Sequence, residues 1–143
     1  MAVKGLTGEQ MFDSLALAIG HRDERGAFAP DRNSPRARFV ERFAAQGKPS
    51  EPETSVAQAL TLMNGRFLTD ATSLDKSETL AAVVELPGLE MAQRIEILYL
   101  ATLSRMPSDA ERERLMRHVG ADTRRLADVF WVLLNGAEFR LNH

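Results

Sequence analysis

Two stretches of this chain decide its fold: ILYLATLSRMPSDAE at residues 97–111 and DVFWVLLNGAEFRLNH at residues 128–143. Upstream of the first stretch, Met91 and Ile95 begin an apolar stripe that continues through Leu98, and other apolar residues fill the remaining sides. A helix that is apolar nearly all round is buried all round. The pattern therefore predicts a central helix from about residue 89 to 105, ended by the Met106-Pro107 pair, because a residue before proline is disfavoured in helical conformation.

The second stretch belongs to a long amphipathic helix that Asp122 can cap. Its apolar residues follow the i, i+3, i+4, i+7 spacing of one helical face. They are Leu126, Val129, Phe130, Leu133, Leu134 and Ala137, with Trp131 and Val132 widening the stripe. We expect this face to pack against the 89–105 helix. Asn135 beside Gly136 is typical of a left-handed exit from a helix.

Further helices are marked by their start and stop signals. Capping boxes open at Thr7, Ser55 and Ser108, and Ser34 followed by Pro35 marks one more helix start. Glycines 20, 47 and 120 stand where helices would stop, and a short helix is expected over residues 78–84. Asn64-Gly65 indicates a kink or a stop and restart. Since no alternating strand is bounded by turn signals, the sequence predicts an all-α fold, a compact irregular bundle of six or seven helices.

We expect the 143 residues to form a single helical domain, 1–143, that is a fragment of a larger protein. Two segments interrupt it. Residues 21–34 show neither helical nor strand periodicity and predict a flexible loop, and residues 47–54 are a polar connection with two prolines.

The cysteine count and the net charge argue against several kinds of binding site. Without cysteine, the chain has no disulfide, thiolate metal site or attachment motif for c-type haem. Net charge is −2, so no overall field attracts nucleic acid. The stretch from Arg22 to Arg42 has six cations but four interleaved anions. We expect no cofactor, no nucleic-acid partner and no membrane span, and the oligomeric state stays open.

No motif indicates catalysis. His21, His118 and His143 lie too far apart for a local metal motif, and no serine sits in a nucleophile-elbow pattern. We therefore predict no catalytic and no metal-binding residues, and a chain that is not itself an enzyme. The remaining candidates for an interaction surface are charged residues around the loop. They are His21, Arg22, Asp23, Arg25, Arg36 and Arg38.

Three motifs in order carry a resemblance to a known family. A leucine-rich helix ends in Asn64 and Gly65, a second motif has the form Leu-x-Arg-x-Pro followed by an acidic cap, and a third reads Trp-x-Leu-Leu-Asn-x-x-Glu-Phe. The motif residues other than leucine, methionine and glycine are Asn64, Arg105, Pro107, Glu111, Trp131, Asn135, Glu138 and Phe139. Together they resemble the C-terminal part of a planctomycete-specific domain family of unknown function, found in large exported proteins, some with cytochrome-c-like domains.

The polar motif residues have structural explanations. Arg105 near a helix end can bond the last carbonyls, Glu111 completes a capping box, and Glu138 can pair with an arginine of a neighbouring helix. We expect these residues to hold the fold together.

The resulting expectation is a helical interaction or architectural module of a larger, exported or cell-surface protein, since export is what the resemblance implies. Its partners would be other domains of the parent protein or another protein. One alternative is an accessory part of an enzyme whose active-site residues lie elsewhere in the parent. Another is weak anion or nucleic-acid binding through the Arg22 to Arg42 stretch.

Overall fold

A computed structural model describes residues 4–21, 34–44 and 66–142 of the chain, and its fold is all-α, as predicted. The helices are α1 (Gly8–Ile19), α2 (Pro35–Ala44), α4 (Arg66–Ala71), α5 (Glu78–Glu85), α6 (Met91–Leu103), α7 (Asp109–Val119), a 3₁₀ turn (Thr123–Arg125), α8 (Leu126–Asn135) and α9 (Ala137–Arg140). Two very short strands, β1 (Lys4–Gly5) and β2 (Leu141–Asn142), complete the elements.

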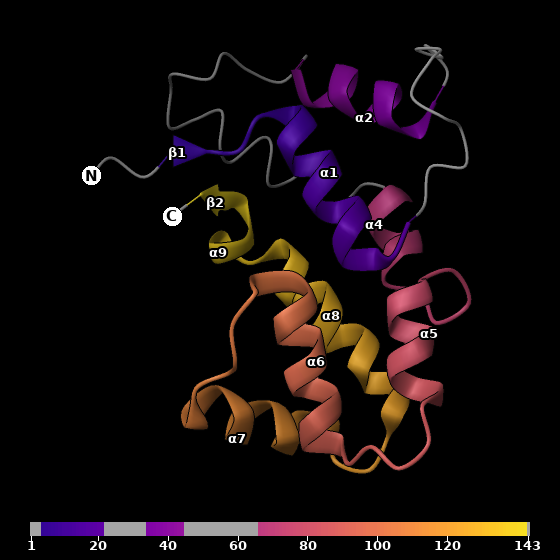
Figure 1. Ribbon diagram of the computed structural model, residues 1–143, viewed down its shortest axis with the longest axis vertical. Coiled ribbons are helices and arrows are strands. Elements are labelled where there is room, and N and C mark those ends of the chain that lie inside the picture. Colours follow the sequence, from indigo (N-terminus) through magenta and orange to yellow (C-terminus); the bar gives the residue numbers. More distant parts are fainter. Residues whose placement is uncertain (1–3, 22–33, 45–65, 143) are drawn as a thin grey trace.

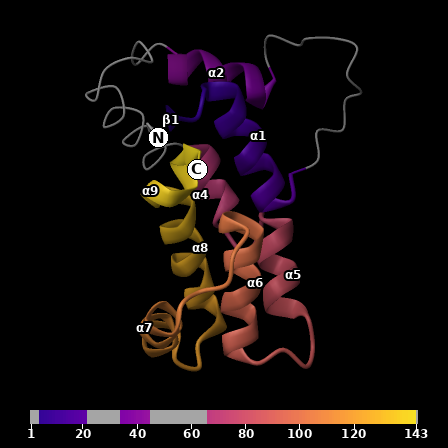
Figure 2. The same ribbon diagram turned by 60° about the vertical axis from the view of Figure 1, so that its left-hand side comes forward.

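Helix α6 lies at the centre of the arrangement. It packs against α1, α5, α7, α8 and α9. In Figure 2, α5, α6 and α8 run side by side, with α7 across the lower end. Helix α1 lies toward the other end of the molecule, and α2 lies across α1 (Figure 1). The helices therefore form a bundle whose least covered member is α2.

The core is formed mainly by apolar side chains from α1, α4, α5, α6 and α8, with one residue each from α7 and α9. Leu98 of α6 and Phe130 and Leu134 of α8 are completely buried. The predicted packing of the final long helix on the central helix is thus confirmed. Burial on α6 is less complete than the all-round pattern predicted, because Leu100 is 48% exposed. One side of α6 therefore faces solvent, where the sequence pattern had predicted burial on every side.

Local start and stop signals correctly located several of the described helix ends, although Asp122 caps the 3₁₀ turn before α8 rather than α8 itself. Thr7 and Gln10 form a reciprocal capping box, and Gly20 adopts the left-handed conformation that ends α1. Ser34 accepts a hydrogen bond from the amide of Ala37 at the start of α2. Helix α6 ends before the Met106-Pro107 pair, because Ser104 already takes a left-handed conformation with φ 54°.

The predicted long C-terminal helix is wrong in its last part. It breaks at Gly136, whose φ of −60° and ψ of 149° are extended, so the expected left-handed exit at Asn135 and Gly136 does not occur. Ala137 is exposed and Val132 is 55% exposed, so neither belongs to the buried stripe. After the break, α9 has a direction of its own, and Phe139 enters the core.

The two described ends of the chain are joined. Strand β1 pairs with β2 in antiparallel register, with Lys4 opposite Asn142 and Gly5 opposite Leu141. The amide of Leu6 donates to the carbonyl of Arg140 at 3.3 Å. Figure 1 shows both strands on one side of the molecule. Strands of two residues leave no alternation for a sequence pattern to reveal.

Several predicted segments fall outside the described residues. These are most of the 21–34 loop, the 47–54 connection, the helix opened by Ser55, and Gly47, Asn64 and Gly65. Among the helices that are described, none has the length and apolar character needed to cross a bilayer.

Candidate functional site

Three polar residues of the family-like motifs meet around Arg105. Its Nε and Nη2 donate to the two carboxylate oxygens of Glu138 at 2.5 and 2.7 Å. Its Nη1 and Nη2 donate to Glu111 at 3.0 and 2.9 Å, and Nη1 also donates to the carbonyl of Met106 at 3.0 Å. The guanidinium is thus forked on two carboxylates, the geometry to which arginine is suited. We call Arg105, Glu111 and Glu138 the Arg105 cluster.

Local backbone structure brings these three side chains together. The left-handed turn at Ser104 ends α6 and is followed at once by Arg105. Ser108 caps α7, and Glu111 bonds back to the Ser108 amide at 2.8 Å as the third residue of a capping box. The break at Gly136 starts α9, which carries Glu138. The cluster therefore ties the end of α6, the start of α7 and α9.

Arg105 and Glu111 stay charged over a wide pH range. Hydrogen bonds from Arg105, followed by the bond from the Ser108 amide, lower the pKa of Glu111 from 4.5 to about 2. Hydrogen bonds to Glu138 and then Glu111 raise the pKa of Arg105 further above its usual value. Because the three side chains are between 32% and 39% exposed, water screens their attraction. The cluster is a hydrogen-bonded tie at the surface rather than a buried charge network.

Tyr99 supports the cluster from the core side. The guanidinium carbon of Arg105 lies 5.2 Å from the centre of the Tyr99 ring, within cation–π distance. Tyr99 is buried, and this burial, followed by the negative charge of Glu111, raises the pKa of its hydroxyl. All three nitrogens of the Arg105 guanidinium donate hydrogen bonds, to Glu111, to Glu138 or to the carbonyl of Met106. The arrangement therefore fixes the positions of the helices rather than presenting a free cation.

Two further arginines hold α6 in place and were missed by the sequence reasoning. Arg94 donates to the carbonyls of Val83, Val84 and Leu86. Its guanidinium thereby caps the C-terminal end of α5. Arg112 of α7 pairs with Glu96 of α6 at 3.0 Å. Both contacts connect different helices across a turn. Only the i to i+4 spacing of arginines and acids within one helix can be seen in a sequence, so no local signal identified them.

The other family-motif residues mainly serve packing. Pro107 and Phe139 are buried, and Trp131 is half-buried. Asn135 is buried, and its Nδ2 donates to the carbonyl of Trp131 at 2.8 Å. The buried Oδ1 of Asn135 has no hydrogen-bond partner in the described part of the chain. Asn64 is outside the described residues.

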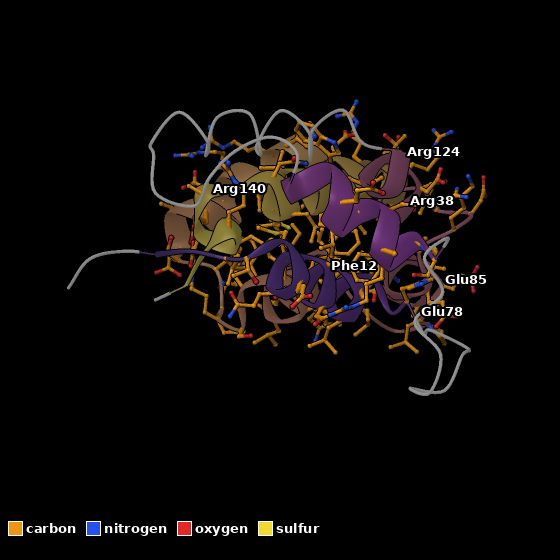
Figure 3. All side chains as sticks on the ribbon, turned by 90° about the horizontal axis from the view of Figure 1, so that it is seen from above. Phe12, Arg38, Glu78, Glu85, Arg124 and Arg140 are labelled. Atoms are coloured by element: carbon orange, nitrogen blue, oxygen red, sulfur yellow. The ribbon has the colours of Figure 1, made fainter. Side chains whose placement is uncertain are left out.

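The candidate interaction residues near the loop do not come together as a described site. Arg22, Asp23 and Arg25 lie outside the described residues, and His21 is exposed at the end of α1. Arg36 is bound bidentately by Asp13 of α1, at 3.1 Å for both hydrogen bonds. Arg38 is exposed on α2, as Figure 3 shows.

The described segments contain no group of three or more histidine, aspartate or glutamate side chains that could hold a metal ion. His118 is placed at the end of α7, where its Nε2 lies 3.2 Å from Asp128. Arg125 donates to the carbonyl of His118 at 2.8 Å. These contacts connect α7 to α8, which is a structural role.

Comparison with known proteins gives no relative: no family model, no curated protein and no solved structure matches the chain.

Proposed function

We propose that this chain is an architectural module of a larger, exported protein and that it holds the flanking parts of that protein close together. The observation that carries this proposal is the antiparallel pairing of β1 with β2. Chain segments that enter and leave on one side of a bundle are suited to a domain placed within or between others. Export of the parent is suggested by the family resemblance alone.

The Arg105 cluster supports the same role. It anchors α9, the helix that leads directly into β2, to the turn between α6 and α7. The position of the outgoing chain is thereby fixed by contacts with the middle of the bundle.

A distance measurement between the chain ends tests the proposal. Donor and acceptor fluorescent proteins are fused to the N- and C-termini of the chain, and energy transfer is measured in the native state and in denaturant. We expect high transfer that falls as the bundle unfolds. The matched control is Leu98→Asp, which places a charge in the fully buried core and unfolds it.

Transfer in the wild-type fusion that is no higher than in Leu98→Asp would contradict the proposal. The second alternative from the sequence, anion binding through the Arg22 to Arg42 stretch, is favoured by no described contact, since Arg36 is engaged by Asp13.

A further inference from the structure

The last six described residues, 137–142, make contacts with two distant parts of the bundle. We call residues 137–142 the C-terminal strap. On one side, Glu138 holds Arg105 at the turn between α6 and α7. On the other side, β2 pairs with β1, and the carbonyl of Arg140 accepts from the amide of Leu6. The C-terminal strap thus contacts both the N-terminal strand β1 and the Arg105 side chain.

The strap is also separated from the helix before it. Gly136 has an extended conformation, so the backbone hydrogen bonds of α8 do not continue regularly into α9. The amide of Gly136 bonds back to Leu133 at 3.2 Å, which closes α8. A Cβ at position 136 would lie 3.2 Å from that same carbonyl oxygen, which is tighter than most Cβ contacts. The break therefore suits glycine and makes residues 137–142 a unit distinct from α8.

The attachments of the strap differ in strength. Phe139 enters the core, and Glu138 makes two charge-assisted hydrogen bonds, whereas the β1–β2 pairing is only two residues long. Isolated two-residue pairing cannot persist on its own in water. The pairing of the chain ends must depend on the strap being held in position by Phe139 and Glu138.

We propose that the C-terminal strap is a latch that couples the two chain ends to the Arg105 cluster. Releasing Glu138 loosens the β1–β2 pairing, and separating the chain ends loosens the Glu138 to Arg105 bonds. A flanking domain or partner that pulls on either end would then alter the turn between α6 and α7. This coupling goes beyond holding the ends close, and it does not require that the parent protein be exported.

Residue-resolved amide hydrogen exchange tests the latch in the intact chain. Glu138→Gln removes the negative charge of the strap but keeps its shape. We expect exchange at the Leu6 amide to become faster on the order of fivefold, while the Leu98 amide in α6 stays within about twofold of the wild-type rate. The matched control is Glu113→Gln, which removes a carboxylate that lies 3.8 Å from Arg117 on the outside of α7.

The reverse direction is tested by removing residues 141–143, which deletes β2. The Arg105 Nε–H, which donates to Glu138, should then exchange several-fold faster than in the full chain. The latch is overturned if Glu138→Gln and Glu113→Gln leave Leu6 exchange equal. It is also overturned if Leu6 and Leu98 accelerate together, or if deletion of β2 leaves the Arg105 Nε–H unchanged.

Discussion

The contact between α6 and α8 and the contact between α1 and α2 are held by different forces. Helices α6 and α8 meet through side chains that are fully removed from water, including Leu98, Phe130 and Leu134. Helix α2 lies on α1 through the half-exposed Phe39 and through an ion pair on the surface. The first contact gains the full hydrophobic free energy of burial, and the second gains only part of it.

The aromatic and charged contacts of α2 show this difference in detail. The rings of Phe12 and Phe39 lie 5.5 Å apart at 57°, a favourable tilted arrangement. Figure 3 shows Phe12 of α1 directed toward α2. The Arg36 and Asp13 side chains are 41% and 61% exposed, so their attraction is screened. We infer that α2 is appended to a bundle whose stability resides in α6 and α8.

The largest expected effect is in the core. Leu98→Ala should lower the free energy of unfolding by about 2 to 5 kcal/mol, because the side chain is completely buried and a cavity would remain. Leu133→Ala, on the facing side of α8, should fall in the same range, toward its lower end, since Leu133 is slightly exposed. Chemical denaturation measures both. A loss below that of an exposed-site control such as Leu17→Ala would remove α6 and α8 from the centre of the fold.

The Arg105 cluster should give an intermediate effect. Arg105→Gln leaves two carboxylates without their shared cation and removes the cation–π contact with Tyr99. We expect a loss of about 1 to 2 kcal/mol, less than a buried charge network would give, because the side chains are about one third exposed. Arg105→Lys should recover only part of the loss, since lysine cannot fork on two carboxylates. Full recovery with lysine would show that charge alone matters.

The same cluster predicts a pH dependence. The pKa of Glu111 is lower in the folded protein, about 2, than its ordinary 4.5. The unfolded chain therefore binds a proton first, so the stabilisation from Glu111 is complete above about pH 5 and is lost as pH falls toward 2. Wild-type stability should decrease across this range more steeply than that of Arg105→Gln. Parallel pH profiles for the two proteins would contradict the assigned role of Arg105.

The smallest effect is expected at α2. Arg36→Ala should change the free energy of unfolding by no more than about 0.5 to 1 kcal/mol, because it removes an exposed ion pair. Thermal denaturation in low and high salt measures it, and salt should reduce the difference between variant and wild type. Unfolding of the protein by this one substitution would mean that α2 is part of the core.

Much of the fold could be predicted from sequence because its signals are local. The capping boxes at Thr7 and Ser108 depend on residues three apart, and both form as expected. Glu138 was expected to pair with an arginine of a neighbouring helix, and it does pair with an arginine, but that arginine is Arg105, which lies beyond the end of α6. The expected bonds from Arg105 to the last helix carbonyls are absent among its described contacts, because its fork is taken by the two carboxylates and the Met106 carbonyl. The role of Glu111 in a cap is confirmed as well.

What could not be predicted depends on contacts between distant residues. Arg105 and Glu138 are 33 positions apart, so the sequence could not select this arginine from the others. The helix breaks at Gly136 although the apolar spacing of the sequence continues past this position. Only the burial of Phe139 and the position of Glu138 explain the break. The β1–β2 pairing joins opposite ends of the sequence through two residues on each side.

Exchange of backbone amides in the native protein, compared between α8 and α2, tests most directly which helices carry the stability. If α6 and α8 carry the stability, the amide of Phe130 exchanges only through global unfolding, with the same free energy that denaturation gives. The amide of Phe39 should exchange through local opening at a clearly lower free energy. Equal protection of Phe39 and Phe130 would show instead that α2 is as much a part of the cooperative core as α8.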